Sequence, residues 1–278
     1  MKRFLIIIIA ISSFYLTSCN KIEEPYTLPV PTKDWYGKKI LLEDYTGHKC
    51  QNCPAAAAIA ANIKEQYGEK VIVLAVHAGS FAKPTPPNYP EDFRTVAGDA
   101  WNDFFGISLA GNPNGLVNRK GYPGLHIIAP GEWASKIGNA LAEIPEVGIT
   151  VKNTYNPADS SVSGKIDFKF LKTIKKKLKY QILISEDSII APQLNATTII
   201  PNYLHRHMLR ASVNGPWGND LTDGNSFNLI DSEISKSFAY SLKATDLIKY
   251  KIKDCSVIVF VYDDATKEIL QTEEIHIK

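Results

Sequence analysis

Residues 39–67 read KILLEDYTGHKCQNCPAAAAIAANIKEQY. The apolar run at 39–45 is typical of a strand, and the alanine-rich run at 55–67 is typical of a helix. Two cysteines three apart at the start of a helix project from one turn, so Cys50 and Cys53 can form a disulfide with little backbone movement. This stretch therefore predicts a strand, a dithiol and a helix in that order, and it points to thiol-disulfide chemistry.

The two cysteines are expected to differ in reactivity. Cys50 would lie at the positive end of the helix dipole, where the thiolate is favoured over the thiol, and Lys49 adds a neighbouring cation. We therefore expect Cys50 to be the nucleophile and Cys53 to be the resolving partner. A charged imidazole at His48 would also favour the thiolate, but we expect His48 to be a loop histidine that faces solvent.

A permanent disulfide that staples a loop in an oxidising compartment is the alternative interpretation of the cysteine pair. A small closed loop adds only modest chain-entropy stabilisation, which favours chemistry over a purely structural role. Pro54 stands where a haem-attachment sequence needs histidine, and one cysteine pair falls short of the four ligands of a structural zinc site. His205 and His207 lie two apart, but the sequence offers no evident third ligand nearby. We expect no metal and no cofactor.

The N-terminus carries a targeting pattern. Lys2 and Arg3 precede an uncharged run at 4–16, which leads to a short stretch of small residues and Cys19. The apolar run is too short to span a bilayer as a mature helix, and small residues directly before a cysteine mark a cleavage site. The pattern resembles a bacterial lipobox, which implies that residues 1–18 are a signal peptide and that Cys19 carries the lipid.

The segment after the signal peptide, residues 19–35, is expected to form the lipid anchor and a stalk. It contains prolines at 25, 29 and 31, which disfavour helix and central strand alike. Residues 20–24 loosely resemble the acidic signals that send some Bacteroidetes lipoproteins to the cell surface. We expect an outer-membrane lipoprotein that contacts the membrane through its lipid, with periplasm-facing and outward-facing placements both open.

The charge balance bears on possible partners. The chain has 31 basic and 29 acidic residues, and removal of Lys2 and Arg3 with the signal peptide makes the two numbers equal. The basic run at 175–177 is interpreted as a solvated turn between two strands. We therefore expect no nucleic-acid partner, and the sequence leaves the oligomeric state open.

The pattern changes character near Pro145, from alternating strands and helices to strands and turns alone. The first part reads as strand 39–45, helix 53–67, strand 71–77, helix 91–105, strand 116–119 and helix 132–143. The second part reads as strands at 148–154, 161–170, 179–186, 205–213, 237–242, 256–262 and 269–277. We predict an α/β domain at 36–145 followed by an all-β sandwich domain at 146–278.

From residue 39 to residue 121 the order of features resembles the thioredoxin fold, and the stretch 111–121 is similar to the segment that holds the cis-proline of that fold. By this resemblance Pro113 would carry a cis peptide bond facing the dithiol, and Asn112 would offer backbone hydrogen bonds to a partner chain. Asp44 matches the buried acid that handles the proton of the resolving thiol, with Glu43 on the opposite strand face as the fallback. The residues around the cysteines depart from the usual ones, so the reduction potential does not carry over.

The chain as a whole is similar to the Omp28-related outer-membrane lipoproteins of Bacteroidetes, in which a thioredoxin-like domain precedes a β-rich one. The likeness is carried by the lipobox and by residues 45–54, 111–119, 203–210 and 214–218. The leading hypothesis is thiol-disulfide exchange with protein thiols or disulfides, in which Lys49, His48 and Asn112 contact the partner. The alternative is a non-catalytic surface binding or adhesion-type lipoprotein in which the Cys50–Cys53 disulfide is structural.

Overall fold

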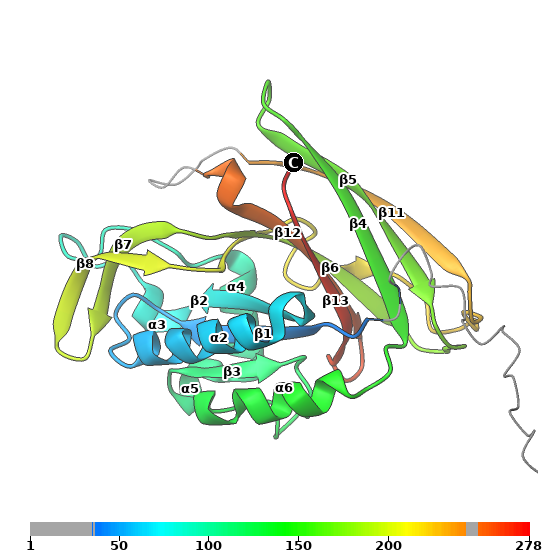
Figure 1. The fold of residues 1–278 in the computed structure, drawn as a ribbon, viewed down its shortest axis with the longest axis horizontal. Helices are drawn as coiled ribbons and strands as arrows, with labels where there is room; N and C mark the ends of the chain where they lie inside the picture. The colour runs from blue at the N-terminus through cyan, green and yellow to red at the C-terminus, as the bar shows by residue number, and fades with distance from the viewer. Residues whose placement is uncertain (1–34, 36, 243–249) are drawn as a thin grey trace, which may run out of the picture. The chain divides into compact units, whose positions relative to one another are not determined.

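The structure, a computed structural model, describes Trp35 and residues 37–242 and 250–278 (Figure 1). The predicted signal peptide, the predicted lipidation site Cys19 and the predicted stalk up to residue 34 lie outside these residues. All described residues belong to one compact unit. Its fold is mixed α/β and consists mostly of strands. Within the described ranges, none of the helices is long and apolar enough to cross a membrane.

An eight-stranded sheet forms the centre of the described fold (Figure 1). Its main strands, in spatial order, are β13 (Ile269–His276), β12 (Cys255–Asp263), β6 (Leu178–Glu186), β9 (Met208–Ser212), β2 (Val71–His77), β1 (Ile40–Thr46) and β3 (Asn114–Val117). The short strand β10 (Asn219–Asp220) pairs with β6. Strands β1 and β2 run parallel, and β3 pairs antiparallel with β1.

Two smaller sheets and several helices complete the described part of the chain. One sheet has the strand order β11 (Glu233–Ser241), β5 (Ser161–Phe170) and β4 (Val147–Asn156), and the other pairs β7 (Ile189–Asn195) with β8 (Thr198–His205). The α-helices are α2 (Cys53–Tyr67), α3 (Gly79–Ala82), α4 (Val96–Phe105), α5 (Ile107–Ala110) and α6 (Trp133–Leu141). Short 3-10 helices span Gly68–Lys70, Pro130–Glu132 and Ile252–Asp254.

Side chains of β1 and β2 alternate between the two faces of the large sheet, because neighbouring residues of a strand point to opposite sides. Leu41 and Ile72 pack with Trp101 of α4 on one face. Ile40 and Val71 pack with residues of α2 and α6 on the other face. Every residue of β1 and β2 is buried, which is the pattern of strands covered on both faces.

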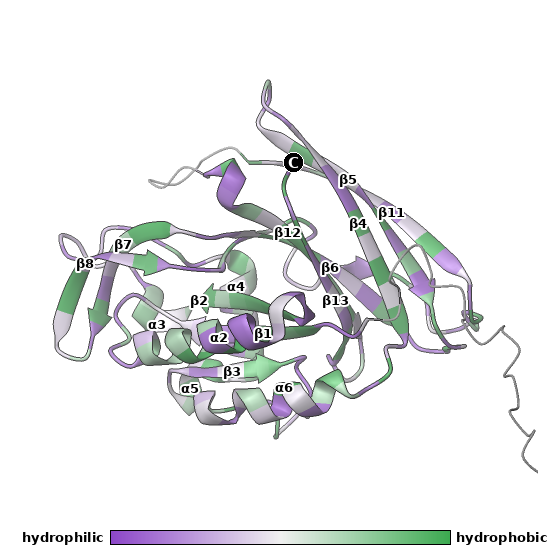
Figure 2. Ribbon diagram, viewed as in Figure 1, coloured by the Kyte–Doolittle hydropathy of each residue, from purple (hydrophilic) through white to green (hydrophobic). Residues whose placement is uncertain are grey.

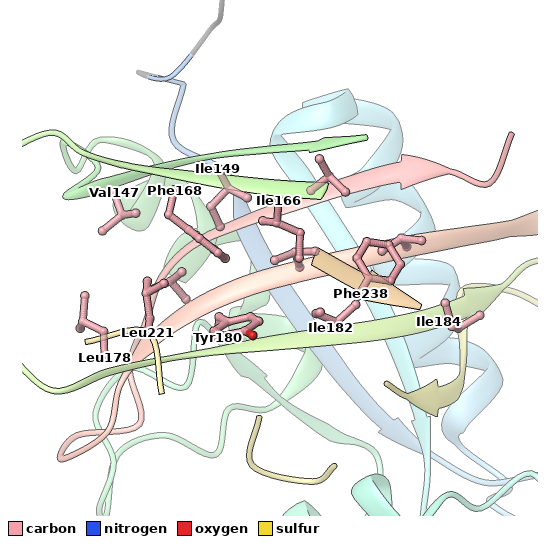
Figure 3. Packing of buried hydrophobic residues seen from close by; sticks show 14 of the residues in the cluster. Val147, Ile149, Ile166, Phe168, Leu178, Tyr180, Ile182, Ile184, Leu221 and Phe238 are labelled. Carbon is pink, nitrogen blue, oxygen red and sulfur yellow. The ribbon is translucent and has the colours of Figure 1, made fainter. Parts of the chain in front are cut away.

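The three-stranded sheet packs against β6 and β12 through another cluster of buried residues (Figure 3). Ile166 and Phe168 of β5 meet Ile182 of β6 in this cluster. Leu183, which follows Ile182 in β6, and Ile258 of β12 belong instead to the buried cluster around α4. Figure 2 shows alternating hydrophilic and hydrophobic residues along β4 and β5, as expected for strands with one covered face. The β-rich character predicted for the second half is confirmed.

The predicted boundary between residues 145 and 146 lies just before β4. Strand β9, from the second predicted domain, pairs parallel with β2, from the first, at Ala75 and Met208. The backbone amide of Ala75 also donates to the carbonyl of His207 over 2.8 Å. One sheet therefore contains strands from both sides of that boundary.

Several predicted elements have the expected bounds. The helix at 53–67 and the strand at 71–77 match α2 and β2. The strand predicted at 205–213 is shorter in the structure, where β9 covers Met208–Ser212 and His207 turns the chain with a φ of 53°. The β7–β8 hairpin is not predicted from the sequence, and it lies against the dithiol loop.

Candidate functional site

Cys50 and Cys53 are joined by a disulfide with a Cα–Cα distance of 5.4 Å. Cys53 is the first residue of α2, so the pair stands at the N-terminus of this helix, as predicted. Cys255, a third cysteine within the described residues, is buried in the cluster between the sheets, and burial raises its pKa to about 12. It therefore serves in core packing, as its apolar neighbours in the sequence indicate.

The β7–β8 hairpin covers the loop that carries the disulfide. The backbone amide of Leu194 donates to the carbonyl of His48 over 2.8 Å, and the amide of Ala196 donates to the carbonyl of Gln51 over 2.9 Å. These two hydrogen bonds attach the end of β7 and the turn of the hairpin to the loop that carries the disulfide. Both cysteines are only 2% exposed. A protein partner cannot contact either sulfur directly in this conformation.

Gln193 of β7 ties the hairpin to the cysteine loop. Its side chain is buried, and its Nε2 donates to the carbonyls of Gly47 over 3.4 Å, Cys50 over 3.1 Å and Leu194 over 2.9 Å. An amide group has two N–H donors, so the three carbonyls share them. A single buried amide therefore joins the two segments that enclose the disulfide.

Replacing Gln193 by alanine should speed up reduction of the native disulfide. Loss of the hydrogen bonds lowers the free energy of lifting the hairpin by about 1.4 kcal/mol, which corresponds to about a tenfold faster reaction. The measurement is the rate at which thiols appear in the folded protein when the reductant is a reduced dithiol protein, which is too large to enter the site unless the hairpin lifts. Gln181→Ala is the matched control, because Gln181 is also buried but donates to Ser212 of β9 and to Asn214 and Gly215 just after it. Equal reduction rates for the two variants would contradict the conclusion that Gln193 holds the hairpin over the disulfide.

His48 is buried rather than facing solvent. It is 1% exposed, and its ring stacks on Tyr89 with centroids 5.0 Å apart. Its Nε2 lies 3.2 Å from the carbonyl oxygen of Lys83. Burial lowers the pKa of this imidazole, so it supplies no cation to Cys50 at neutral pH. The expectation that His48 faces solvent is therefore wrong, because the proline-rich segment 79–90 packs over the ring.

Lys49 joins the same proline-rich segment to the cysteine loop. Its backbone amide donates to the carbonyl of Phe81 over 3.0 Å. Its ammonium donates to Oγ1 of Thr85 over 2.9 Å. Lys49 therefore helps to hold the proline-rich segment against the cysteine loop, and it also places a positive charge next to Cys50.

Asp44 and Glu43, as neighbours on β1, face opposite sides of the sheet. Glu43 accepts two hydrogen bonds from the Arg119 guanidinium, over 2.8 and 2.7 Å, and both side chains are fully buried. Asp44 is 3% exposed, and its Oδ1 has no hydrogen-bond partner among the residues that the structure describes. Burial raises the pKa of Asp44 to about 7. Asp44 can therefore exchange a proton near neutral pH, whereas Glu43 is held in an ion pair.

A cavity of 510 Å³ lies between α2 and the β7–β8 hairpin. Its wall includes Cys53 and Asp44, whereas Cys50 does not contribute to it. Ala61 of α2 and Leu204 of β8 also line it, and both are exposed, so the cavity opens to solvent between the helix and the hairpin. The volume falls in the range of small-ligand pockets, about 300–1,000 Å³.

Three histidines line this cavity, and two of them, His77 and His205, are buried. His77 ends β2 and His205 ends β8, with ring centroids 5.4 Å apart and with Phe93 beside both. Within the described ranges, neither nitrogen of His77 has a hydrogen-bond partner, and Nε2 of His205 has none. Burial lowers the pKa of His77 and lowers that of His205 to about 4, so both rings are neutral at pH 7.

The same polar groups do not form a metal centre. In the part of the chain that the structure describes, no three or more His, Cys, Asp and Glu side chains are arranged to hold a metal ion. The two histidines considered from the sequence as a ligand pair, His205 and His207, both line the cavity, but the chain turns between them after β8. The cavity therefore offers neutral imidazoles and one acid to a ligand.

Pro113 lies at the same end of the sheet as the dithiol loop. The next residue, Asn114, begins β3 and pairs with Tyr45, one residue before β1 ends. The Asn112–Pro113 peptide bond is cis, as expected. Oδ1 of Asn112 is buried and has no hydrogen-bond partner in the described part of the chain. Asn112 and Pro113 are thus placed where β1 leads into the cysteine loop.

His77 and Gln193 were not predicted as members of the site. A signal for His77 exists in the sequence, because it ends a buried strand whose parallel neighbour runs directly into the cysteine loop. In the structure His77 pairs with Thr46 at that end of the sheet. Gln193 carries no comparable signal, since the segment around it does not have the pattern of a strand.

Two solved structures are similar to this chain in fold, with TM-scores of 0.50 or more. HBP35 of Porphyromonas gingivalis is similar with a TM-score of 0.62 and 19% identity, over 88% of this chain and 77% of that chain. Protein AGR_C_4864 from Agrobacterium tumefaciens is similar with a TM-score of 0.50 and 13% identity, over 86% of this chain and 94% of that one. A domain of the outer membrane lipoprotein Omp28 from Porphyromonas gingivalis matches with a TM-score of 0.35 and 21% identity, over 49% of this chain and 91% of that chain.

The family comparison covers well over half of the chain. No curated protein matches the sequence at a significant level. The family model described as outer membrane protein Omp28 matches residues 99–278, a range that includes β3, α6 and every strand from β4 to β13. The chain therefore belongs to the Omp28 family of outer membrane proteins.

Proposed function

We propose that this protein is a lipid-anchored, thioredoxin-like protein of the outer membrane that exchanges disulfides with protein thiols through Cys50 and Cys53. Family membership supports the location. The order β1, dithiol, α2 and β2, with β3 antiparallel beside β1, supports the thioredoxin-like assignment of residues 36–145. Residues 146–278 would present or dock the partner.

The observation that carries this proposal is the position of Asp44. This carboxyl is buried, no cation among the described residues offsets the effect of burial on its pKa, and it lines the same cavity as Cys53. A buried, unpaired acid lowers the stability of the folded protein. A disulfide that served only as a staple would not need such an acid beside it. An acid with a pKa near 7 is suited to take and return a proton at neutral pH.

Exchange with a partner disulfide would proceed in two steps once the hairpin is lifted. The Cys50 thiolate attacks one sulfur of the partner, whose S–S bond breaks and releases a first thiolate. Cys53 then gives its proton to Asp44 and attacks the sulfur of Cys50, and the partner's second sulfur leaves and takes that proton. The partner is reduced by two electrons and the Cys50–Cys53 pair is oxidised. Asn112 and Pro113 would contact the partner chain.

The lipid anchor is proposed at Cys19, after removal of residues 1–18. Several acyl chains on this cysteine would hold the protein on the membrane far more firmly than one chain does. Mass spectrometry of the purified N-terminal peptide tests the modification. Proteolysis of intact cells tests which side of the outer membrane the folded part faces.

The exchange reaction is tested with single-cysteine variants. The Cys53→Ser variant, incubated with insulin as a protein disulfide, should accumulate a mixed disulfide through Cys50, because no resolving thiol is left to release it. The Cys50→Ser variant is the matched control and should trap much less insulin. A disulfide that resists reduction in the native protein, together with no insulin captured by either variant, would contradict the proposal.

A second candidate function is supported by the burial of the disulfide. With both cysteines 2% exposed, the pair can act as a staple in a binding or adhesion-type lipoprotein that makes no use of its redox chemistry. This candidate predicts no turnover in an insulin-reduction assay from either the wild type or Cys50→Ala. It also predicts the same binding of the true partner by the wild type and by a Cys50→Ser variant that has kept its fold.

A further inference from the structure

We propose that the cavity between α2 and the β7–β8 hairpin binds low-molecular-weight disulfides and that Cys53, rather than Cys50, is the sulfur that attacks them. This inference rests on the proposed thiol-disulfide exchange and narrows its substrate class. It differs from the protein route, in which Cys50 reacts first and the hairpin has to be lifted.

The two cysteines are equally buried, each 2% exposed, but they differ in what lies beside them. Cys53 lies in the wall of the 510 Å³ cavity, and Cys50 does not. On the Cys50 side, the hairpin bonds to the loop through Leu194 and Gln193, and the proline-rich segment bonds to it through Phe81. A small molecule can therefore reach Cys53 through the cavity while the cover stays in place, whereas a protein loop cannot.

The cavity wall suits a small disulfide with an apolar frame and a few polar groups. Helix α2 lines it with alanines and Pro54, and the hairpin adds Ile200 and Leu204. Three of its lining residues, Asp44, His77 and His205, have buried polar atoms that have no hydrogen-bond partner in the described part of the chain. Buried polar atoms are nearly always satisfied, so these groups point to a molecule that enters the cavity.

The reaction balances without an added oxidant or reductant. Cys53 of the reduced protein gives its proton to Asp44, and its thiolate attacks one sulfur of the disulfide RSSR. The RS–SR bond breaks, and the first RS⁻ leaves and takes the proton from Asp44. The Cys50 thiolate then attacks the sulfur of Cys53, and the second RS⁻ leaves and takes the proton that Cys50 had released. RSSR is reduced to two RSH, and the protein dithiol is oxidised to its disulfide.

The first arm of the test compares the two single-cysteine variants in the full chain. Reduced Cys50→Ser and Cys53→Ser proteins are mixed with bis(2-hydroxyethyl) disulfide, and formation of the mixed disulfide is followed by intact mass. Cys53, in the Cys50→Ser protein, should react about tenfold faster than Cys50 does in the Cys53→Ser protein. An equal or reversed order would overturn the inference.

The second arm fills the cavity. In the Cys50→Ser background, Ala57→Phe should slow the reaction about tenfold, because Ala57 lines the cavity. Ala55→Phe is the matched control, since Ala55 is exposed on the same helix outside the cavity wall, and its rate should stay unchanged. Ala61→Phe, at the exposed mouth, takes the place of Ala57→Phe if circular dichroism finds that variant unfolded. Equal rates in the filled and control variants would overturn the inference.

Failure of this inference can be told apart from failure of the proposed function. If the wild type exchanges with insulin, but the variants show neither the preference for Cys53 nor the effect of cavity filling, the proposed exchange is supported and the small-disulfide site is wrong. If the wild type exchanges with neither insulin nor bis(2-hydroxyethyl) disulfide, both the proposed function and the small-disulfide site are wrong.

Discussion

Replacing Glu43 by glutamine is expected to lower the free energy of unfolding by about 3–5 kcal/mol, because it leaves a buried guanidinium without its counter-ion. Both Arg119 and Glu43 have fully buried side chains. The guanidinium carbon of Arg119 also lies 4.8 Å from the ring centroid of Trp101, 5.1 Å from that of Phe105 and 5.0 Å from that of Phe260. These rings exclude the water that would otherwise solvate the orphaned charge.

Chemical denaturation of the folded protein measures this effect. Glu273→Gln is the matched control, because Glu273 pairs with Lys39 in a contact whose side chains are 20% and 23% exposed. This partly exposed pair should contribute no more than about 1 kcal/mol. If Glu43→Gln cost as little as Glu273→Gln, the Glu43–Arg119 pair would not be the anchor between β1 and the segment after β3.

The local pattern around Cys50 was enough to predict the elements that carry the dithiol. An apolar strand, two cysteines and an alanine-rich run stopped by Gly68 define β1 and α2 without any distant contact, because each element is fixed by its own residues. The assignment of Asp44 as the buried acid came from a family resemblance. The structure buries its carboxyl beside the cavity that Cys53 lines.

The hairpin that covers the site could not be predicted in the same way. Pro192 lies inside β7 and Pro201 inside β8, and proline normally argues against a strand. The structure accommodates Pro192 at a shift of register between Ala191 and Gln193. The turn places Ala196 at a φ of 50°, a conformation for which glycine or asparagine is the usual signal.

Long-range pairing was also beyond the local pattern. Strand β9 joins the sheet beside β2 through the pair Ala75 and Met208, which are far apart in the sequence. Nothing near either residue specifies the other, because strand order depends on how the whole chain packs. The cavity next to Cys53 depends on this pairing, since the β7–β8 hairpin directly precedes β9.

Replacing Asp44 by asparagine is expected to stabilise the protein by about 4 kcal/mol at about pH 8, and to leave stability nearly unchanged at about pH 4. Burial raises the pKa of this carboxyl from 3.8 to about 7. Above the higher value, the folded wild type holds an unpaired carboxylate in the sheet interior, whereas the variant has a neutral amide of the same shape.

The direction in which stability changes with pH follows from proton binding. Between about pH 4 and pH 7 the folded state keeps a proton on Asp44 that the unfolded state has released, so the wild type loses stability as the pH rises through this window. His77 and His205 act in the opposite direction, because their lowered pKa values mean that the unfolded state binds protons more readily. Both proteins contain these histidines, so their contribution cancels in the difference.

The measurement is the difference in unfolding free energy between the oxidised Asp44→Asn variant and the oxidised wild type across this pH range. The difference should grow with pH and level off above about pH 7, where the folded wild-type carboxyl has lost its proton. A difference that does not change with pH would mean that Asp44 has an ordinary pKa in the folded protein. In that case the acid beside Cys53 could not act as the proton carrier for exchange at neutral pH.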